Sequence, residues 1–507
     1  MKVARHATIE REVKLGVWPG FELPDLNGTL DGAAASGPEE WRLEAVYFDT
    51  PDLRLLRRGA TVRFRRGEEP GEVWTAKLPE ETPALGLAHR EISIPGKAAS
   101  MPTLLEDLLR GWALGAPLVP IARLRILRHR TTLRQPNGEA LAVVDDDEVS
   151  ILQRSRVAAR FRELELELAD GAPAKLLKRL ARRLRSAGAE PVDQMPKLVH
   201  ALGPSALALW DLAPPKLRAR PTAGELIRAA LVASAARLVD HLASVVLDKD
   251  VEGIHQARVG IRRLRSDLRT TRSLLDKGAV AVLRRELDWL MSQLGEVRDL
   301  DVLLARLRSD VESLDAGDRG GADAVLAQAV KDRAAAYEQL RAELRTPRCA
   351  SVLEETARVA TAPPFTARAA KRPATDVLPR LVRRPLGDLR REAKKHGSSP
   401  DDGALHRLRI AVKHVRYATE LTEPVAGKQA RRAAGGLARV QDVLGDHNDA
   451  CTAEVRLRAL GESTGSRGAW AAGLLGGLQR ARAAECRKRF TSVWADATKA
   501  KRWRWVE

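Results

Sequence analysis

The sequence predicts a multidomain α+β protein, in which an antiparallel β domain precedes an all-α domain. Its 507 residues exceed what a single core of ordinary size accommodates. Up to about residue 170, short runs with alternating apolar residues are separated by Gly, Pro and Asp turns, which is typical of antiparallel strands. From residue 222 onward, long stretches rich in Ala, Leu and Arg show helical periodicity. We therefore expect domains at residues 1–203 and 222–500, with a proline-bearing linker at 204–221.

The positive charge is concentrated in the second domain. The formal net charge is +19, of which residues 1–203 contribute about +2 and residues 204–507 the remaining +17. A field of this size predicts a polyanionic partner, without saying which polyanion.

The remaining composition indicates a soluble, cytoplasmic protein without a membrane partner. No apolar run approaches the roughly 18 residues that a membrane helix needs, and no signal segment follows Met1. Cys349, Cys451 and Cys486 lack paired or metal-ligand spacing, so they predict ordinary buried thiols rather than disulfides or zinc ligands.

The first predicted strand, residues 9–16, reads IEREVKLG. Residues two apart share one face of a strand, so Glu10, Glu12 and Lys14 project together. The apolar residues between them favour packing of the opposite face against another layer. The charged face then borders a solvent-filled or ligand-filled space, although a solvated sheet face is the simpler explanation of one such strand alone.

Charged residues alternate on several later strands as well. A closed barrel lined by both signs of charge needs bound ions. Arg and Lys neutralise phosphate oxygens, whereas carboxylates hold the Mg²⁺ or Mn²⁺ that bridges to a phosphate substrate. The coincidence of these strands indicates phosphate chemistry with a divalent metal. The residues are Arg63 and Arg65 in TVRFRR, Lys77 in EVWTAKL, Arg90 and Glu91 in HREISI, a basic cluster at Arg123, Arg125, Arg128 and Arg130, an acidic turn at Asp145, Asp146 and Asp147, and Glu163, Glu165 and Glu167 in FRELELEL.

These motifs, in this order, resemble the CYTH domain of the triphosphate tunnel metalloenzymes over residues 1–203. The segments YFDTPDLRLLRRGATVRFRR and ARLRILRHR contribute to the resemblance. It implies an eight-stranded antiparallel tunnel that binds a triphosphate end-on with one or two divalent cations, Mg²⁺ or Mn²⁺. Inorganic triphosphatase, thiamine triphosphatase and adenylate cyclase are the activities it implies as candidates.

The resemblance also implies roles for single residues. Glu10, Glu12 and Lys14 match the family signature, the glutamates as metal ligands and the lysine as a phosphate contact. One metal would hold the triphosphate in line, while carboxylates bind a second metal or orient the attacking water. Tyr47 and Asp49 match a family turn and are interpreted as a folding signature. Further phosphate contacts are Arg63, Arg65, Lys77, Arg90, Arg128 and Lys197, the last equally explained as a surface helix residue, and further metal ligands are Asp147, Glu165 and Glu167, the last two favoured over Glu163.

The helical domain contains an internal duplication. Aligning GIHQARVGIRRLRSDLR with ALHRLRIAVKHVRYATE requires a shift of 151 residues, and QLGEVRDLD aligns with VLGDHNDAC at a shift of 150. The shared basic residues fall at i, i+3, i+7 and i+10, on one helix face. Two such faces related by a pseudo-two-fold axis would repel each other unless a polyanion or carboxylates neutralise them, which favours an anion-binding groove over solvated helix faces. The repeats cover about residues 222–360 and 376–500, joined by an irregular connection at 361–379.

The duplicated region resembles the CHAD domain, a helical module that binds inorganic polyphosphate. HQARVGIRRLR and HRLRIAVKHVR carry the resemblance, supported by Arg298 and Asp299. The second copy departs from the first at Lys413, and at His447 and Asn448. Polyphosphate ligands implied by the resemblance are His255, Arg258, Arg262, Arg263, Arg265, His406, Arg409, Lys413 and Arg416.

Three functions remain open at this point. The favoured one is a polyphosphate-binding protein whose tunnel hydrolyses inorganic triphosphate or short polyphosphate. We expect such a protein to be concentrated at polyphosphate granules. The alternatives are a non-catalytic polyphosphate-binding protein, or nucleotide cyclisation, for which nothing marks a purine pocket. Nucleic acid is a less favoured partner, because 3 Tyr and 6 Phe leave little aromatic surface for base stacking.

Overall fold

The structure is a computed structural model. It describes residues 6–29, 32–68, 71–79, 87–169, 171–191, 197–203, 206, 208–248, 251–397 and 400–506. The chain divides into two compact units, Met1–Trp210 and Asp211–Glu507. Their boundary falls inside the connector expected at 204–221.

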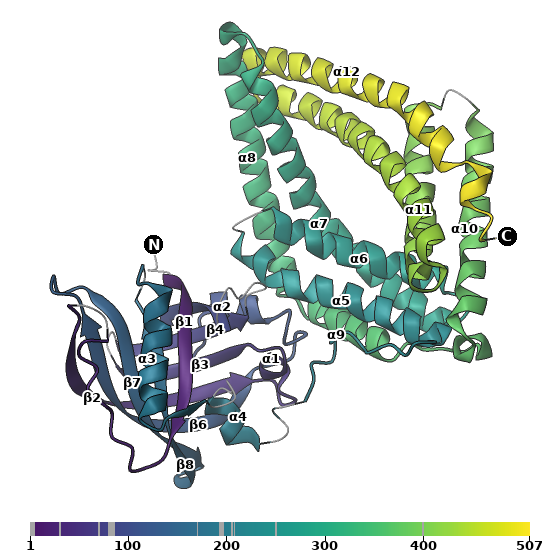
Figure 1. Cartoon of the computed structure of the whole chain (residues 1–507). Coiled ribbons are helices and arrows are strands. Elements are labelled where there is room, and N and C mark those ends of the chain that lie inside the picture. Colours follow the sequence, from purple (N-terminus) through teal and green to yellow (C-terminus); the bar gives the residue numbers. More distant parts are fainter. Residues whose placement is uncertain are drawn as a thin grey trace. The chain divides into compact units, whose positions relative to one another are not determined.

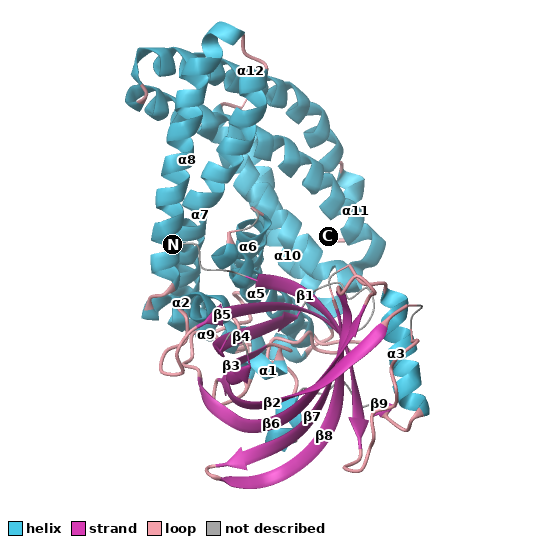
Figure 2. Cartoon of the chain, turned by 90° about the vertical axis from the view of Figure 1, so that its left-hand side faces the viewer, coloured by secondary structure: helices cyan, strands magenta, loops and turns pink. Residues whose placement is uncertain are grey.

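The N-terminal unit is an antiparallel sheet that closes on itself (Figure 1, Figure 2). The strand order is β5-β4-β3-β2-β6-β7-β8-β1-β9, and β5 also pairs with β1. The eight long strands thus form a tunnel, which confirms the predicted fold class. The strands are β1 (His6–Val17), β2 (Ala34–Asp49), β3 (Thr61–Glu68), β4 (Gly71–Pro79), β5 (Leu87–Pro95), β6 (Val119–Arg134), β7 (Ala140–Gln153), β8 (Arg156–Leu168) and the short β9 (Glu190–Pro191).

The outer face of β1 packs against helix α3 (Ala174–Ser186), which lies outside the barrel in Figure 2. Leu15 is buried against this helix, and Val13 is partly buried beside it. The helix presents three fully buried leucines spaced one turn apart, Leu176, Leu180 and Leu184. This packing confirms that the apolar face of the first strand lies against another layer, which leaves the alternate residues Glu12 and Lys14 for the tunnel interior.

The acidic segment at residues 145–147 lies in the middle of β7, so its assignment to a turn was wrong. Asp145 and Asp147 share the inner face with their β6 partners Arg130 and Arg128. Asp146 takes the outer face, where Arg162 donates hydrogen bonds of 2.8 and 2.7 Å to its two oxygens. The strand period of two therefore sends two of the three aspartates into the tunnel.

One end of the tunnel's inner face is apolar. Leu124 and Ile126 alternate with Arg128 on β6 and therefore share its face. With Val149 of β7 they form a buried cluster that includes Leu198 of helix α4 (Lys197–Leu202). Helix α4 thus covers the apolar end, and the charged residues occupy the rest of the lumen. Two short helices, α1 (Arg54–Arg57) and α2 (Thr103–Leu109), complete the unit.

The C-terminal unit is all-helical (Figure 1). Helices α7, α8, α11 and α12 share one buried core, and α10, α11 and α12 share another. The helices are α5 (Ala223–Leu247), α6 (Glu252–Thr270), α7 (Lys277–Glu312), α8 (Ala316–Leu344), α9 (Pro347–Thr361), α10 (Ala374–His396), α11 (Asp402–Ser463) and α12 (Gly465–Ala497), with short 3₁₀ turns at Arg368–Lys371 and Ala500–Arg502.

The helix order follows the duplication seen in the sequence. Helix α11 is broken at Gly427, whose φ of 56° and ψ of −134° are not helical. Its two segments correspond to α6 and α7 of the first copy, whereas α10 and α12 correspond to α5 and α8. The irregular connection is shorter than predicted, because α10 already begins at Ala374 and includes Pro379 and Pro385. Trp503 is 2% exposed in a core cluster, so the C-terminal segment is packed rather than frayed.

One helix among the described residues, α5, has the length and apolar composition of a membrane span. The sequence-based statement that no run approaches this length was therefore wrong. Most of its apolar residues are buried within the helical unit, where it packs against α6 and α9. A core helix of this kind meets the same criteria, so α5 is weak support for a membrane partner.

Candidate functional site

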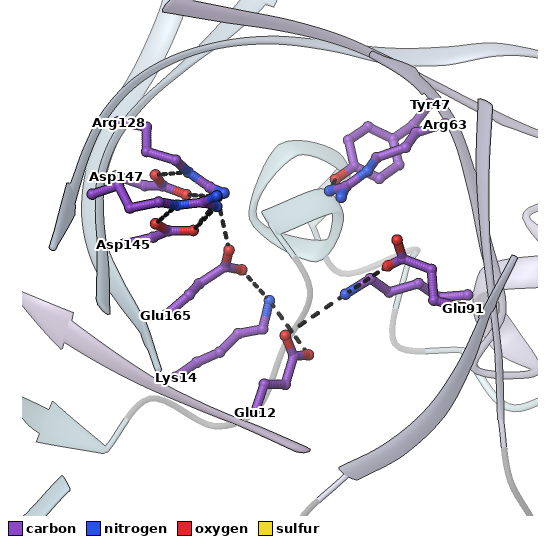
Figure 3. Close-up of polar contacts among 11 residues, drawn as sticks. Glu12, Lys14, Tyr47, Arg63, Glu91, Arg128, Asp145, Asp147 and Glu165 are labelled. Carbon is purple, nitrogen blue, oxygen red and sulfur yellow. Dashed lines mark hydrogen bonds and ion pairs between the residues drawn. The ribbon is translucent and has the colours of Figure 1, made fainter. Parts of the chain in front are cut away.

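Lys14 lies within a ring of alternating charges inside the tunnel (Figure 3). Its Nζ donates a hydrogen bond of 2.5 Å to Glu165 Oε1 and lies 3.8 Å from Glu12 Oε1. Lys77 Nζ lies 3.7 Å from Glu12 Oε2 and 3.5 Å from Glu91 Oε2. Burial by itself would lower the pKa of Lys14, but Glu165 and Glu12 outweigh it and raise that pKa. The ammonium group therefore stays charged inside the tunnel.

Arg128 fixes the part of the tunnel wall next to Glu165 (Figure 3). Its Nε and Nη2 donate to the two oxygens of Asp147 at 2.7 and 2.6 Å. Nη1 lies 2.5 Å from Asp145 Oδ2, and Nη2 donates a 3.0 Å hydrogen bond to Glu165 Oε2. Arg130 donates two further hydrogen bonds to Asp145, of 2.6 and 2.7 Å. Because each bond constrains the next, these side chains form a rigid, preorganised wall.

Arg63 presents an unused donor to the lumen. Its Nη1 donates a hydrogen bond of 3.2 Å to the hydroxyl of Tyr47, which lies directly opposite on β2. Its buried Nε has no hydrogen-bond acceptor among the described residues. Arg65 shares the same strand face. A buried guanidinium with a spare donor is suited to binding an anion.

Two carboxylates face each other across adjacent strands at the site where a metal is expected. Glu12 of β1 is the register partner of Glu167 of β8. Like charges directly opposite destabilise a strand pair unless a cation lies between or near them. Glu167 is exposed, but partial shielding from solvent raises its pKa, with Lys77 opposing that effect. The charges of Glu91 and Glu12 add to the rise in this pKa. Oxygen donors of this kind fit Mg²⁺ or Mn²⁺, so Glu12 and Glu167 are the residues best placed to hold the ion.

The other predicted metal ligands are held more closely by arginine or lysine than Glu12 is, whose lysine contacts are 3.7 and 3.8 Å long. Asp147 uses both oxygens on Arg128, and Glu165 is shared between Lys14 and Arg128. Their metal roles stay predictions, and they require the cations to move or to be shared with the substrate. The side chains of Glu10, Arg90 and Lys197 lie outside the described residues.

Several tunnel residues were not selected from the sequence. Glu91 lies opposite Lys77 on β5, and Asp145 and Arg130 extend the wall around Arg128. The cross-strand pairing of an acidic with a basic run was the signal that could have found them. Glu163, given less weight than its neighbours, is 2% exposed and borders a cavity of about 1550 Å³.

Asp49 has a structural role, as predicted for the YFDTPD segment. Its two carboxylate oxygens accept hydrogen bonds of 2.9 Å from the backbone N–H groups of Leu55 and Leu56. The side chain is 1% exposed. Asp49 therefore fixes helix α1 against the end of β2, whereas Tyr47 has the additional contact to Arg63.

The repeated basic residues of the helical unit meet in one cavity of about 400 Å³. Helix α6 contributes His255, Arg258 and Arg262, and α11 contributes Arg409 and Lys413. Their copies are related by the shift of 151 residues, so the duplication builds the cavity from both halves. Asp299 and Asp449 also line it, and Arg258 Nη2 lies 3.7 Å from Asp299 Oδ1.

The cavity is short of negative charge. Arg258 Nε and Nη1 are buried without a hydrogen-bond acceptor among the described residues, as is Arg409 Nε. Burial, followed by the charges of Arg409 and Arg262, lowers the pKa of Lys413 to about 7. Burial also lowers the pKa of His255, with Arg298 and Arg262 adding to the effect. A polyanion would supply the missing acceptors and reverse these shifts.

Four of the predicted polyphosphate ligands do not line this cavity. Arg263 and Arg416 are both paired with Glu420, at 2.9 and 2.7 Å. Arg265 is paired with Asp288, and His406 contacts Asn448 at 2.7 Å. Arg456 lines the cavity although it was not predicted. Its equivalent at a shift of 150 is Arg306, so the repeat contained a signal for it.

A separate group of metal-donor atoms lies in the second helical copy. Asp402, His447 and Cys451 each offer an atom within 4.8 Å of the others. The spacing of the cysteines alone did not indicate this group. Asp402 already contacts His447 at 3.0 Å and Arg487 at 2.9 Å. The carboxylate is thus neutralised by protein groups.

The two units define a protein that combines a mixed-charge β tunnel with a duplicated, basic helical module. Residues 8–199 match the CYTH domain family, and residues 229–458 match the CHAD domain family. The chain is therefore a CYTH–CHAD protein, as the sequence motifs indicated. The CYTH domain places it in a metal-dependent class that acts on triphosphates or nucleotides.

Similar proteins share this organisation or one half of it. The uncharacterized protein Rv2226 of Mycobacterium tuberculosis strain ATCC 25618 / H37Rv is 28% identical over 531 residues, which cover 98% of each chain. The CHAD domain from the plant Ricinus communis is 26% identical, covering 57% of this chain and 96% of that one, with a TM-score of 0.48. The putative adenylyl cyclase HpAC1 from Hippeastrum, described as having a dominant triphosphatase activity, is 16% identical, covering 38% and 95%, with a TM-score of 0.23.

Proposed function

We propose that this protein binds inorganic polyphosphate through its helical unit and hydrolyses inorganic triphosphate, or the ends of short polyphosphate, in its tunnel. The observation that carries the enzymatic part is the ring in which Lys14 lies between Glu165 and Glu12, with Glu167 opposite Glu12. Such a ring supplies cations for phosphate oxygens and carboxylates for a metal within one lumen.

The tunnel residues divide the chemistry among themselves. Lys14, Lys77 and Arg63 would neutralise the phosphate oxygens and hold the chain in line. Glu12 and Glu167 would hold Mg²⁺ or Mn²⁺, which when bound supplies Lewis-acid stabilisation of the developing phosphate charge. A neighbouring carboxylate would orient the attacking water. The apolar end beneath α4 favours entry of a chain end from the charged side rather than passage of a long polymer.

The helical unit supports binding of a polymer without bases. Its central cavity offers arginine donors with no acceptor among the described residues. The residues lining it include three arginines, Arg258, Arg262 and Arg409, that derive from both copies. A repeating phosphate chain matches a repeated set of cations, and it needs no aromatic surface. We infer the same soluble, cytoplasmic setting that the sequence predicts.

A hydrolysis assay tests the enzymatic proposal against the two alternatives. The purified chain is given inorganic triphosphate, long-chain polyphosphate, ATP and thiamine triphosphate, each with Mg²⁺ or Mn²⁺. Release of phosphate from triphosphate, lost in Glu12→Ala, supports the triphosphatase. Cyclic AMP from ATP would favour the cyclase instead. Tight polyphosphate binding without any turnover would leave the non-catalytic binding protein.

A further inference from the structure

The two copies of the helical unit are not symmetric beside the central cavity. Arg269 of α6 contacts His414 Nε2 of α11 at 3.1 Å. The shift of 151 residues converts this pair into Glu420 of α11 and Arg263 of α6, which form an ion pair of 2.9 Å. The same contact between the two helices is therefore cationic on one side and neutralised on the other.

The neutralised side carries two carboxylates. Glu420 accepts from Arg416 Nε at 2.7 Å in addition to its pair with Arg263. Asp267 and Glu420 line a separate cavity on this side, and Asp267 is 6% exposed. Because both arginines are held by Glu420, this side offers a polyanion little uncompensated positive charge.

The cationic side forms a basic pocket of about 270 Å³ that continues from the central cavity. The central cavity and this pocket share Arg262 and Lys413 as lining residues. No carboxylate lines the pocket among the described residues, although Asp288 pairs with Arg265 nearby. The basic lining residues are Arg262, Arg265, Arg269, Arg284, Lys413 and His414.

The basic surface extends beyond this pocket into a third cavity of about 560 Å³. The second and third cavities share Arg269 and His414. Arg380 and Arg384 of α10 line the far part, where the carboxylates of Asp388 and Glu392 are also present. Shared lining residues thus place the three cavities next to one another in a row.

We propose that bound polyphosphate leaves the central cavity on one side only, along Arg265, Arg269 and Arg284, while Glu420 closes the equivalent path in the other copy. The proposal rests on the proposed polyphosphate binding and adds a direction to it. The duplication builds the central site from equivalent residues of both copies. The position of Arg269 in the first copy is occupied by Glu420 in the second, so the two sides of the site differ in charge. A one-sided path would hold the polymer in a single orientation relative to the helices.

The titration behaviour of His414 agrees with this assignment. Burial lowers its pKa to about 4, and Arg269, Arg265 and Arg284 contribute to the lowering, against Asp388. The imidazole is therefore neutral at physiological pH in a field set by three arginines. Such a field attracts a polyanion along the path.

Matched charge reversals test the direction of the path. Long-chain polyphosphate affinity of the full chain is measured as a function of salt for Arg269→Glu, for the repeat-equivalent pair Arg265→Glu and Arg416→Glu, and for Arg308→Glu, an exposed residue of α7. We expect about a tenfold loss for Arg269→Glu and Arg265→Glu, with a salt slope smaller by about one to two. Arg416→Glu should change affinity no more than Arg308→Glu does.

The alternatives give different results. Equal losses for Arg265→Glu and Arg416→Glu would show that both sides are used and would overturn the one-sided path. A loss in Arg269→Glu no larger than that in Arg308→Glu would also overturn it, because the pocket would then not be occupied. If Arg258→Glu removes polyphosphate binding, the proposed binding in the central cavity is kept even when one of these two results excludes the one-sided path. If the unmodified chain binds no polyphosphate, both proposals fail. Thermal melting of each variant identifies a misfolded protein, and Arg269→Gln then replaces the reversal.

Discussion

Glu12 of β1 lies directly opposite Glu167 of β8, so two carboxylates face each other inside the tunnel. Neighbouring lysines compensate only part of this charge, since Lys77 Nζ and Lys14 Nζ remain 3.7 and 3.8 Å from Glu12. The pair is therefore costly without a cation and ready to accept one.

Neutralising Glu167 should raise the stability of the tunnel unit without metal and reduce the stabilisation that a bound metal provides. Without metal, we expect Glu167→Gln to stabilise the tunnel unit by about 0.5–1 kcal/mol, because a like-charge cross-strand pair is removed. With Mg²⁺ or Mn²⁺, the variant should gain less than the unmodified chain does, because a ligand is lost. Thermal melting in chelator and in metal measures both effects.

Glu72, exposed on β4, provides the control for this comparison. Glu72→Gln removes the same charge from the same sheet and should leave the metal-induced shift in melting temperature unchanged. An equal metal response in Glu167→Gln and in the unmodified chain would exclude Glu167 as a ligand.

Removing Arg128 should destabilise the tunnel strongly. Its guanidinium pairs with Asp145, Asp147 and Glu165, and it is 5% exposed. Arg128→Met removes both hydrogen bonds that Asp147 accepts from it and one of the cations that contact Asp145 and Glu165. We expect this loss to cost about 3–5 kcal/mol in a buried site. Urea denaturation followed by circular dichroism measures the loss.

Arg162 offers a matched comparison, because it binds Asp146 with two hydrogen bonds on the outer face of the same sheet. Arg162→Met should cost less than half as much, because Arg162 pairs with the single carboxylate of Asp146, whereas Arg128 pairs with three carboxylates. Similar costs for both variants would mean that the inner network has no special dependence on Arg128.

The sequence predicted the architecture of the tunnel more completely than it predicted the metal site. The alternation around Lys14 was sufficient to place charges inward, because apolar residues such as Leu15 fix the opposite face. The three consecutive aspartates at 145–147 have no apolar residue between them to show which of them face inward. Only the pairing of Asp147 with Arg128 and of Asp145 with Arg130 determines this. Glu91 was noted among the charged strand residues but was given no role, since its partner Lys77 is on another strand.

In the helical unit, too, the sequence located the site but did not settle every one of its ligands. The repeat located the central cavity, because equivalent residues of two copies, such as Arg258 and Arg409, meet at a pseudo-two-fold axis. It also predicted Arg416 as a ligand, which Glu420 instead holds at 2.7 Å. Glu420 lies four residues after Arg416 on the same helix, so the sequence spacing contained a signal for this pair. The second contact of Glu420, to Arg263 of α6, depends on how the helices pack.

Polyphosphate binding should depend on both copies of the repeat. We expect Arg258→Glu and Arg409→Glu each to weaken binding by at least about tenfold at low salt and to flatten its salt dependence, because each removes one phosphate contact and adds repulsion. Fluorescence anisotropy with labelled long-chain polyphosphate measures both quantities. Unchanged binding in both variants would remove the central cavity from the binding path.

Asp267 should make the stability of the helical unit pH-dependent. Burial raises its pKa to about 7, with Arg263 opposing the effect. The carboxyl group is thus protonated in the folded state up to about pH 7 but only up to about pH 4 in the unfolded chain. Folding stability is therefore highest at low pH for this group and decreases as pH rises between these values.

Asp267→Asn tests this expectation, since the amide cannot ionise. The variant should be more stable than the unmodified chain by about 2–4 kcal/mol at pH 8, with little difference at pH 4. Denaturant titrations at both pH values give the comparison. A constant difference across the pH range would show that the effect arises from packing instead of ionisation.

Polyphosphate affinity should fall as pH rises above 7, because of Lys413. Burial and the neighbouring Arg409 and Arg262 lower its pKa to about 7 in the free protein, with Arg258 adding to the effect and Asp449 opposing it. A bound polyanion favours the charged ammonium and raises that pKa, so binding takes up a proton above pH 7. Affinity is then full below pH 7 and decreases by up to about tenfold per pH unit above it.

Lys413→Arg separates this cause from a general effect of pH. Arginine stays charged throughout the range, and the first copy already has Arg262 at the equivalent position. The variant should therefore bind polyphosphate with an affinity that is nearly constant between pH 6 and 9, and isothermal titration in buffers of different ionisation enthalpy should show that proton uptake has disappeared. If the variant keeps the pH dependence of the unmodified chain, the titrating group lies elsewhere, because none of the arginines around Lys413 releases a proton in this range.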